Sequence, residues 1–485
     1  MSPTFPRARA YLPRQLMAVA IAGALLSACA NFDGIDTHAR LAAPSQSGLG
    51  QAVTAWPQDN WWQSYGDEQL NTLIGQAIAQ SPSLKLAKAR IVKAQAATGI
   101  ARSSTQLQLS GAIDSTYQRF TKTSIYPPPL GGANDSLNNA NLEASFDLDF
   151  FGRNRAALDA AIGQARAAEA DAAAARVVLA ANVATTYFQL ARWMEQRAVA
   201  ESTLNVRAQT LKLVQERVAN GLDTRVEQRQ AEGGLPGARL EIAQLDEQIA
   251  LTRNALAALL GAGPDTTKAL APRLAVLQSQ PLPSALPADL VGRRADLSAA
   301  RLRVQAAAHD IDATKAEFYP NVNLIAFAGL GSIGYGKWLD ADSRQYGIGP
   351  AIRIPIFAGG RLRATLSGRT ADYDVAVESY NQTLFEAVRE VADQVASLQS
   401  LAVQTTEQHD AQSAAESAYE LALKRYQAGL TNYLTVLTAE NNVLAQRRQA
   451  IDLKARVLEA NVNLSRALGG GYADASAGTP LHAAN

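Results

Sequence analysis

Two long stretches of the chain have the composition of uninterrupted α-helices. From 152 to 220 and from 360 to 428, Ala, Leu, Glu, Gln and Arg dominate and proline does not occur, which favours continuous helix. Because a helix rises about 1.5 Å per residue, the first stretch is roughly 100 Å long. Helices of this length exceed an ordinary globular domain.

Each long stretch is followed by a second predicted helix, over 222–260 and over 431–468. Both carry apolar or small residues in seven-residue steps, a spacing typical of a coiled-coil seam. The seam positions are Ile242, Leu245, Ile249, Thr252, Leu256 and Leu259 in the first helix and Ala450, Leu453, Val457, Ala460, Leu464 and Ala467 in the second. For these segments alone, a plain long coiled coil stays open as an interpretation.

The segments between the helices have a period of two. Stretches at about 106–151 and about 320–358 alternate apolar and polar residues around turn-rich sequence. Each predicts a β-hairpin whose strands, at about ten residues, match the length that crosses a bilayer. The apolar positions are Leu107, Leu109, Ile113, Tyr117, Leu142, Ala144, Phe146, Leu148, Phe150, Val322, Leu324, Ala326, Ile348, Ile352, Ile354 and Ile356. A half-buried soluble sheet is the alternative, since Glu143, Asp147 and Asp149 also suit ordinary solvent.

Four strands are too few to close a barrel. An open sheet edge in lipid leaves backbone groups unpaired at several kcal/mol each, so a chain that spans must oligomerise. Known barrels begin at about eight strands, which makes two, three or four copies physically admissible. The predicted fold class is a mixed α and β membrane protein with a long antiparallel α-helical coiled-coil barrel and four transmembrane strands per protomer.

The two halves of the chain repeat one another. RVANGLDTRV at 217–226 and RYQAGLTNYL at 425–434 form the same turn, and Gly429 lies 208 residues after Gly221. This offset aligns 152–261 with 360–469 without a gap, and upstream it changes to 213. The chain is therefore predicted to be a tandem duplication, with copies at 66–270 and 286–470.

The N-terminal residues 1–28 have the pattern of a secretory signal peptide. Three arginines precede the apolar run 16–28, which is too short to span a bilayer. Cys29 follows in LSAC and is the only cysteine, so it has no disulfide partner within the chain. We predict a lipidated extension over 29–65 and, at the other end, a flexible tail over 471–485.

The four residues ending at Cys29 resemble the bacterial lipobox. The resemblance implies covalent lipid on this cysteine, and acyl chains bind a membrane with about 0.8 kcal/mol per buried CH₂. Ala30 follows, not the aspartate that commonly retains lipoproteins in the inner membrane. Sorting to the outer membrane is therefore implied.

Charge and motif content exclude several functional classes. The chain has 45 Lys and Arg against 44 Asp and Glu, without a basic tract suited to nucleic acid. His38, His309, His409 and His482 stand in no metal-ligand spacing, and no phosphate-binding or nucleophile motif occurs. The sequence thus predicts neither an enzyme nor a metal or cofactor site apart from the covalent lipid.

Five segments together resemble a known family, the TolC-type outer-membrane efflux proteins, in their NodT-like lipoprotein branch. They are WWQSYGDEQLNTLI, FDLDFFGRNR, AEFYPNVNL, IPIFAGGRLRA and NVNLSRALGGGY, within about 60–470. The resemblance implies a homotrimer with a 12-stranded outer-membrane barrel continued by a periplasmic helical barrel. It also implies a passive exit duct for drugs or small toxic compounds, whose partners are a periplasmic adaptor and an inner-membrane pump, commonly of the resistance-nodulation-division type.

The resemblance assigns roles to the repeated turns. They would be periplasmic helical tips that dock the adaptor, at Gly221, Leu222, Gly429 and Leu430. A periplasmic gate would involve Glu227 at an acidic position and Tyr426 at a tyrosine position. Thr435 and Thr438 stand where relatives often carry aspartate, and Thr431 where some carry arginine. A solvated charge and a packing aromatic are equal interpretations of Glu227 and Tyr426.

Two departures from the family pattern stand out. Ala295 stands where the family usually has proline, and this change should only make the first turn of the helix less rigid. Gly233, Gly234, Pro236 and Gly237 follow only the first tip, and proline within a helix costs about 3 kcal/mol, so we predict a bend that makes the two hairpins inequivalent. A loss of helix regularity without a function is an equal interpretation. Two other functions stay open: the outer component of a protein secretion system, and a pore-less lipid-anchored coiled-coil scaffold.

We predict that Cys29→Ser abolishes lipid attachment, because the thiol is the acceptor in the lipobox. Incorporation of labelled palmitate measures this. Undiminished labelling of the serine variant would contradict the prediction.

Overall fold

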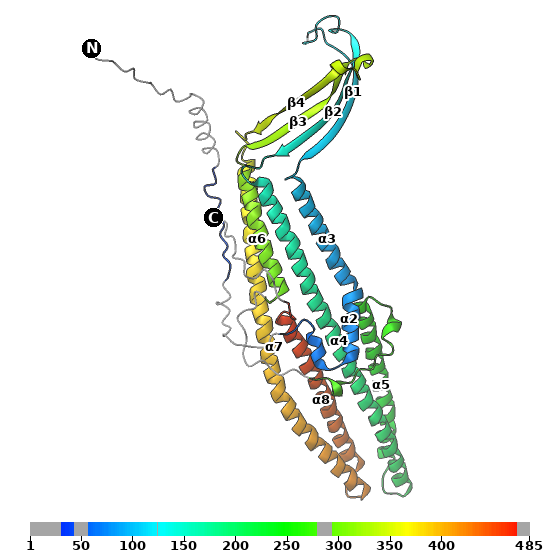
Figure 1. Cartoon of the computed structure of the whole chain (residues 1–485). Coiled ribbons are helices and arrows are strands. Elements are labelled where there is room, and N and C mark those ends of the chain that lie inside the picture. The colour runs from blue at the N-terminus through cyan, green and yellow to red at the C-terminus, as the bar shows by residue number, and fades with distance from the viewer. Residues whose placement is uncertain (1–30, 43–56, 124, 279–292, 473–485) are drawn as a thin grey trace, which may run out of the picture.

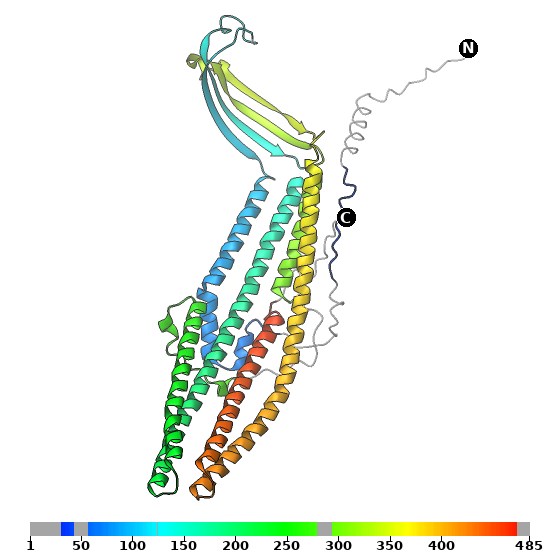
Figure 2. The ribbon, with the colours of Figure 1, turned by 180° about the vertical axis from the view of Figure 1, so that it is seen from behind.

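The computed structural model describes residues 31–42, 57–123, 125–278 and 293–472. A curved sheet stands at one end of the molecule, and two helical hairpins form the opposite end (Figures 1 and 2). Cys29, the predicted signal peptide and all but the first two residues of the predicted tail lie outside the described residues.

The predicted combination of long helices and four strands is confirmed. The helices are α2 (Glu68–Gln80), α3 (Pro82–Ser103), α4 (Arg153–Ala219), α5 (Arg225–Leu260), α6 (Ala295–Ala316), α7 (Arg361–Gln427) and α8 (Tyr433–Ala467). The strands are β1 (Gln108–Arg119), β2 (Asn134–Asp147), β3 (Asn321–Ile333) and β4 (Arg344–Arg353). Helix α5 starts at 225 instead of the expected 222, because Thr224 is its N-cap.

The four strands form one antiparallel sheet in the order β1-β2-β3-β4. Leu109 pairs with Ala144, Ala144 with Ala326, and Ala326 with Ile348. The apolar faces of both hairpins therefore coincide across the sheet. Strands β1 and β4 are its two edges.

The opposite face of the sheet carries mostly polar side chains, with one aromatic exception. Phe327 is opposite Gly347, and a Cβ on Gly347 would lie 2.7 Å from the Phe327 ring. The glycine therefore leaves the space that the ring occupies.

The helices form a layer in which α4 contacts both halves of the chain. Near the sheet α4 packs between α3 and α6, and toward the tips it packs between α5 and α8. A Cβ on Gly163 of α4 would lie 3.0 Å from the Cβ of Ala306 in α6, so these helices approach closely. On the predicted seams, Leu245, Thr252, Leu256, Leu453, Ala460 and Leu464 are buried.

No helix in the described part of the chain combines the length and apolarity needed to cross a bilayer.

The largest aromatic cluster lies midway along the helices. Trp61 packs edge to face against both Trp62 and Tyr65, and Tyr65 packs in the same way on Phe188 of α4. The hydroxyl of Tyr187 donates to Asp67 at 2.8 Å. The WWQSYGDEQL motif thus fixes the N-terminal residues of the first copy against the middle of α4.

The two departures from the family pattern have different outcomes. Helix α6 begins at Ala295 without proline. Helix α5 runs without interruption through Gly233–Gly237 with Pro236 inside it, and the bend stays a prediction.

Candidate functional site

The two repeated turns lie side by side at the end of the molecule opposite the sheet (Figure 2). Gly221 and Gly429 have φ of 71° and 74°, a conformation that glycine adopts without steric cost. Leu222 N–H donates to the Arg217 carbonyl at 2.9 Å, and Leu430 N–H to the Arg425 carbonyl at 2.8 Å. Both helices thus end in the same Schellman-type turn.

Apolar side chains project into solvent at both tips. Leu222 and Leu430 are 65% and 68% exposed. Val226 and Leu434, each four residues further along, are also largely exposed. Because the two pairs are related by the 208-residue repeat, the tips present the same apolar surface twice. Exposed apolar residues that gather in this way are typical of a docking surface.

A buried polar link joins the two hairpins directly behind the tips. Tyr426 of α7 is fully buried, and its hydroxyl donates to the carboxylate of Asp223 in the first turn. The Arg217 guanidinium pairs with Asp223 at 2.8 Å, donates to the Tyr426 carbonyl at 3.0 Å, and lies 4.5 Å from the tyrosine ring centroid. We call these three residues the tip triad.

The tip triad keeps Asp223 ionised. Burial alone would raise the pKa of this carboxyl, but hydrogen bonds from Arg217 and Tyr426 and the arginine charge outweigh it and lower the pKa. Burial, followed by the bond to Asp223, raises the pKa of Tyr426. The carboxylate is therefore an acceptor and the phenol a donor at neutral pH.

Glu227 lies in the first turn of α5, and it binds the start of its own helix. Its carboxylate accepts from the Thr224 N–H at 3.0 Å, and the Thr224 hydroxyl accepts from the Val226 N–H at 3.1 Å. This is a capping box at the start of α5. Hydrogen bonding to Thr224 lowers the pKa of Glu227.

The threonines at the second tip also bind locally. Asn432 is the N-cap of α8 and accepts from the backbone and hydroxyl of Thr435 at 3.1 and 2.9 Å. Thr438 donates to the Leu434 carbonyl at 2.9 Å. Thr431 replaces the acid that Asp223 supplies in the first copy. These threonine contacts stay within the second turn and α8.

Further from the tips, a buried ion pair makes a second link between the hairpins. Arg207 of α4 pairs with Glu440 of α8 at 2.7 Å, and their side chains are 16% and 6% exposed. Arg207 also donates to the Gly234 carbonyl at 3.2 Å. A Cβ on Gly234 would lie 3.4 Å from Arg207, so this glycine leaves room for the arginine to pass α5.

Two more ion pairs continue this series toward the sheet. Arg448 of α8 pairs with Glu241 of α5, and Arg192 of α4 pairs with Asp452 of α8 at 2.6 Å. These pairs are more exposed than Arg207–Glu440, and exposed pairs contribute little stability. The tip triad and Arg207–Glu440 are therefore the stronger links.

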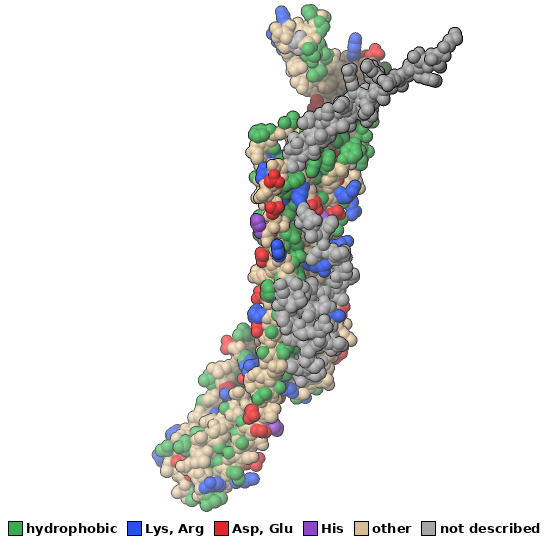
Figure 3. All heavy atoms as spheres, turned by 90° about the vertical axis from the view of Figure 1, so that its left-hand side faces the viewer, with side chains coloured by type: hydrophobic (Ala, Val, Ile, Leu, Met, Phe, Trp, Pro, Cys, Tyr) green, Lys and Arg blue, Asp and Glu red, His purple; other side chains and the backbone are tan. Residues whose placement is uncertain are grey.

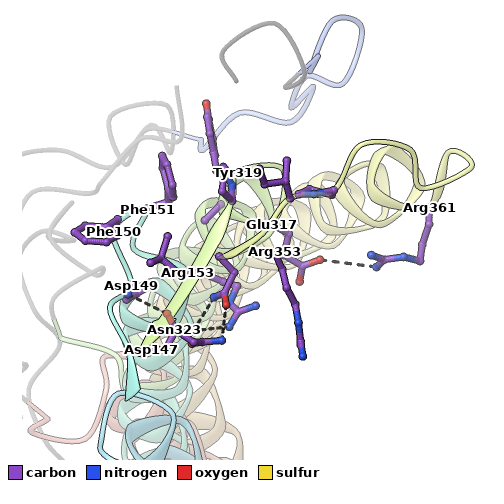
Figure 4. A pocket seen from close by; sticks show the side chains of 16 residues that line it. Asp147, Asp149, Phe150, Phe151, Arg153, Glu317, Tyr319, Asn323, Arg353 and Arg361 are labelled. Atoms are coloured by element: carbon purple, nitrogen blue, oxygen red, sulfur yellow. Dashed lines mark hydrogen bonds and ion pairs between the residues drawn. The ribbon is translucent and has the colours of Figure 1, made fainter. Parts of the chain in front are cut away.

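A cavity of ≈ 490 Å³ lies where the sheet joins the helices (Figure 4). Its polar groups largely satisfy one another: Asp147 pairs with Arg153 at 3.0 Å, and Asp149 accepts from the N–H groups of Asn154 and Arg155 at 3.0 and 2.9 Å. The rings of Phe151 and Tyr319 stack, and their centroids are 4.8 Å apart. The FDLDFFGRNR motif therefore stabilises the connection between strand β2 and helix α4.

Charges are intermingled on the face of the molecule shown in Figure 3, where acidic and basic side chains alternate along the helices. The described residues contain no group of three or more His, Cys, Asp or Glu side chains placed to hold a metal ion.

The sequence identified Tyr426 but not its partners. Arg217 and Asp223 both stand in the RVANGLDTRV turn, and the signal that could have marked them is the copy difference Asp223 against Thr431. Arg207 and Glu440 carried no sequence signal, because their pairing depends on how the two hairpins lie together.

Comparison with known proteins places the chain among outer-membrane channels. The family described as "Outer membrane efflux protein" matches residues 73–262 and 286–470. Multidrug resistance outer membrane protein MdtP of Escherichia coli K12 is 34% identical over 430 residues, covering 87% of this chain and 88% of the relative. Fusaric acid resistance protein FusA of Burkholderia cepacia is 36% identical over 370 residues, covering 73% and 69%.

Solved structures of outer-membrane proteins are similar to this chain in fold. The outer membrane protein VceC from Vibrio cholerae has a TM-score of 0.80 and 38% identity, covering 86% of this chain and 100% of that one. The CusC structure has a TM-score of 0.78 and 29% identity, covering 87% and 98%.

We predict that Arg207→Ala or Glu440→Ala destabilises the contact between hairpins by about 3–5 kcal/mol, because each leaves one buried charge unpaired. The double variant should lose less than either single variant. The melting temperatures of the three variants in detergent, followed by helical circular dichroism, measure these losses.

Arg425→Ala, at an exposed arginine of the second tip, is the control and should leave the melting temperature unchanged. Additive losses in the Arg207 and Glu440 double variant would contradict the pairing.

Proposed function

The chain belongs to the outer membrane efflux protein family, and from this premise we propose that three copies close into one tube that exports small toxic compounds passively. The protein is an outer-membrane exit duct of an efflux system, and it extends into the periplasm. A pore-less scaffold does not agree with this family. The duct has no catalytic activity of its own.

One observation supports the tube. The sheet and the helices form one continuous layer, and the unpaired edges of the sheet lie on the same two sides of this layer as the unpaired helices. In the sheet the edges are β1 and β4. In the helical part, α3 and α5 lie on the β1 side and α7 on the β4 side. Ring closure therefore pairs β4 with β1 and α7 with α3 and α5 of the next copy. Three copies give twelve strands, an even number within the range of membrane barrels.

The hairpin tips are the docking surface for a periplasmic adaptor, which in turn recruits an inner-membrane pump of the resistance-nodulation-division type that the sequence resemblance implies. The repeated exposed pairs Leu222 with Val226 and Leu430 with Leu434 support this assignment. A trimer presents the surface six times, which favours an oligomeric partner with apolar contacts.

The tip triad is the latch that keeps the periplasmic mouth closed. It links the two hairpins of one copy through a charge-assisted hydrogen bond, and removing such a bond costs about 1–3 kcal/mol. Glu227 supports the latch by fixing the start of α5 beside Asp223. Thr435 and Thr438 fix the corresponding start of α8.

The names of the relatives indicate the class of cargo. They include multidrug resistance, fusaric acid resistance and cation efflux proteins. Because these cargoes differ, we assign the choice of substrate to the pump and a wide, weakly selective lumen to this chain. Single-channel conductance of the purified protein in planar bilayers tests the duct itself, and absence of discrete channels would exclude it.

The latch predicts that Asp223→Asn or Tyr426→Phe raises single-channel conductance at neutral pH. A matched control is Tyr433→Phe, because Tyr433 lies in the same buried cluster but outside the triad. Equal conductance of the Asp223 variant and the wild type would contradict the proposal that the tip triad is a latch.

The same latch predicts a particular pH dependence. Because the folded pKa of Asp223 is lowered, its stabilisation is complete above the ordinary carboxyl pKa of about 4 and is lost only as the pH falls through the lowered value. Wild-type conductance should thus be the same at pH 5 and pH 7. A rise in conductance between these values would point to another titrating group.

For docking, we predict that Leu222→Asp with Leu430→Asp abolishes drug export while the trimer still forms. Gly429→Trp should act in the same direction, since its positive φ adds about 1 kcal/mol of strain and the side chain covers the tip. Drug resistance of cells and trimer migration in gels measure the two effects.

Leu339→Asp, at an exposed apolar residue between β3 and β4, is the control and should preserve export. Full resistance with either tip variant would contradict docking at this surface.

A further inference from the structure

The polar face of the sheet carries one aromatic side chain within the four described strands, Phe327 of β3. It is 42% exposed. The strand register places Glu143 of β2 directly opposite on one side and Gly347 of β4 on the other. In the proposed tube this face lines the lumen, because the apolar face of a membrane barrel turns toward lipid. Phe327 thus offers an open ring to whatever passes through the channel.

Two glycines leave the neighbouring strand β4 bare beside this ring. Gly347 has the Phe327 ring above it, and a Cβ on Gly349 would meet nothing within 4 Å. Ile325, two residues before Phe327, is half-buried and lies opposite Gly349. Ile325 and Phe327 therefore form an apolar strip next to a stretch of β4 that has no side chains on this face. A flat apolar molecule fits against such a surface.

Glu143 supplies a negative charge at the edge of the apolar strip. Residues directly opposite in antiparallel strands have Cβ atoms about 4.5–5.5 Å apart, so the carboxylate reaches a group that contacts the Phe327 ring. Glu143 is exposed and has no hydrogen-bond or ion-pair partner among the described residues. Its neighbour on the other side is Ser110 of β1. The carboxylate is therefore available to a ligand.

No basic side chain of the described strands neutralises Glu143 from this face. Arg353 is the one basic residue that these strands present there, and it lies opposite Asn321. Six residues of β3 separate Asn321 from Phe327, a distance of about 20 Å. The Debye length at physiological ionic strength is about 8 Å, so this charge is screened. Asp114 of β1, which is exposed on the same face, adds a second negative charge.

We propose that Phe327 and Glu143, which we call the luminal pair, bind lipophilic organic cations on their way through the duct. The apolar body of the cation packs on the ring and over the bare stretch of β4. Its positive charge lies near the ring face and the carboxylate, which both attract it. An aromatic anion is repelled by the same two groups. This inference rests on the proposed tube, and it names a class of cargo that the channel wall itself favours.

The luminal pair is complete within one copy. Its residues belong to β2 and β3, the two inner strands of the sheet (Figure 1), so closure of the ring covers neither of them. A trimer carries three such pairs at one level of the lumen. Because both side chains are exposed, binding is weak, and a cargo that must leave the channel requires weak binding.

The test uses a reporter cysteine at Gly349, where an added side chain meets no neighbouring atom. In proteoliposomes, Gly349→Cys should react with iodoacetamide, a neutral water-soluble reagent, because the residue faces the lumen. Ile348→Cys, the next residue and on the apolar face, is the control and should react at least tenfold more slowly. The unaltered protein, whose one cysteine is Cys29, measures the background.

Ethidium, a planar aromatic cation, should slow this alkylation of Gly349→Cys in a concentration-dependent way. Tetramethylammonium, which has the charge without the ring system, and fluorescein, an aromatic anion, should not slow it. Adding Glu143→Gln or Phe327→Leu should raise the half-protecting concentration of ethidium by about fivefold, the scale of one exposed cation–π contact. Migration of the variants as trimers in gels shows that they assemble.

Two matched variants separate binding from structural support. Phe327→Tyr keeps the ring and should keep the protection, whereas Phe327→Leu still covers Gly347 with an apolar side chain but has no ring. Asp114→Asn removes a carboxylate from the same face that has Asn139, not an aromatic residue, opposite it. This variant should leave the half-protecting concentration unchanged.

Three results would overturn the luminal pair: no protection by ethidium, equal protection by fluorescein, or an unchanged half-protecting concentration in either Glu143→Gln or Phe327→Leu. Reaction at Ile348→Cys instead of Gly349→Cys would show that the apolar face is in water, and it would refute the tube on which the inference rests. The two failures are therefore distinguishable.

Discussion

Every free backbone N–H and C=O group on β1 and β4 needs a partner once the sheet lies in a bilayer. Hydrocarbon offers none, and each unpaired group costs several kcal/mol. In the proposed ring, β4 of one copy pairs with β1 of the next, and the helical layer of one copy has its free sides in the same places as the sheet. The requirement for closure in the membrane thus decides how the helices meet about 100 Å away.

The long helices transmit the geometry of the ring to the tips. Within one copy, the two contacts between hairpins that lie nearest the tips, Arg207–Glu440 and the tip triad, are more buried than Arg192–Asp452 and Arg448–Glu241. The most buried links therefore lie nearest the tips, where the proposed duct has its periplasmic mouth. This distribution suits a mouth that is closed at rest, because each buried link must be broken or replaced before the hairpins separate.

Duplication supplied two equivalent hairpins, and single substitutions made them different. Asp223 in the first turn has Thr431 as its counterpart, so only one tip can offer a carboxylate to the Tyr426 hydroxyl. Gly234 lets Arg207 pass α5, and its counterpart Asn442 is an exposed residue of α8. Asp374 and Asn381, which accept from N–H groups in residues 38–42, distinguish α7 from α4 in the same way. A shared backbone thus carries different polar side chains in its two copies, and Asp223 and Tyr426 come from different hairpins to form the tip triad.

Much of the fold was predictable, because periodicity and capping act locally. The proline-free stretches determined α4 and α7, strand alternation determined the common apolar face, and Gly221 and Gly429 determined both turns. The 208-residue offset also indicated which positions correspond in the two copies.

The site was less predictable, because its contacts join residues far apart in the chain. Glu227 was assigned the acidic position of the gate, and in the structure it caps its own helix, whereas Asp223 accepts from the Tyr426 hydroxyl. Sequence by itself determined the elements, their lengths and the turn residues, since these follow from neighbouring side chains. Only the tertiary structure decided which charges pair between the hairpins and where residues 31–42 lie on α7, since these depend on how segments far apart in the chain pack together.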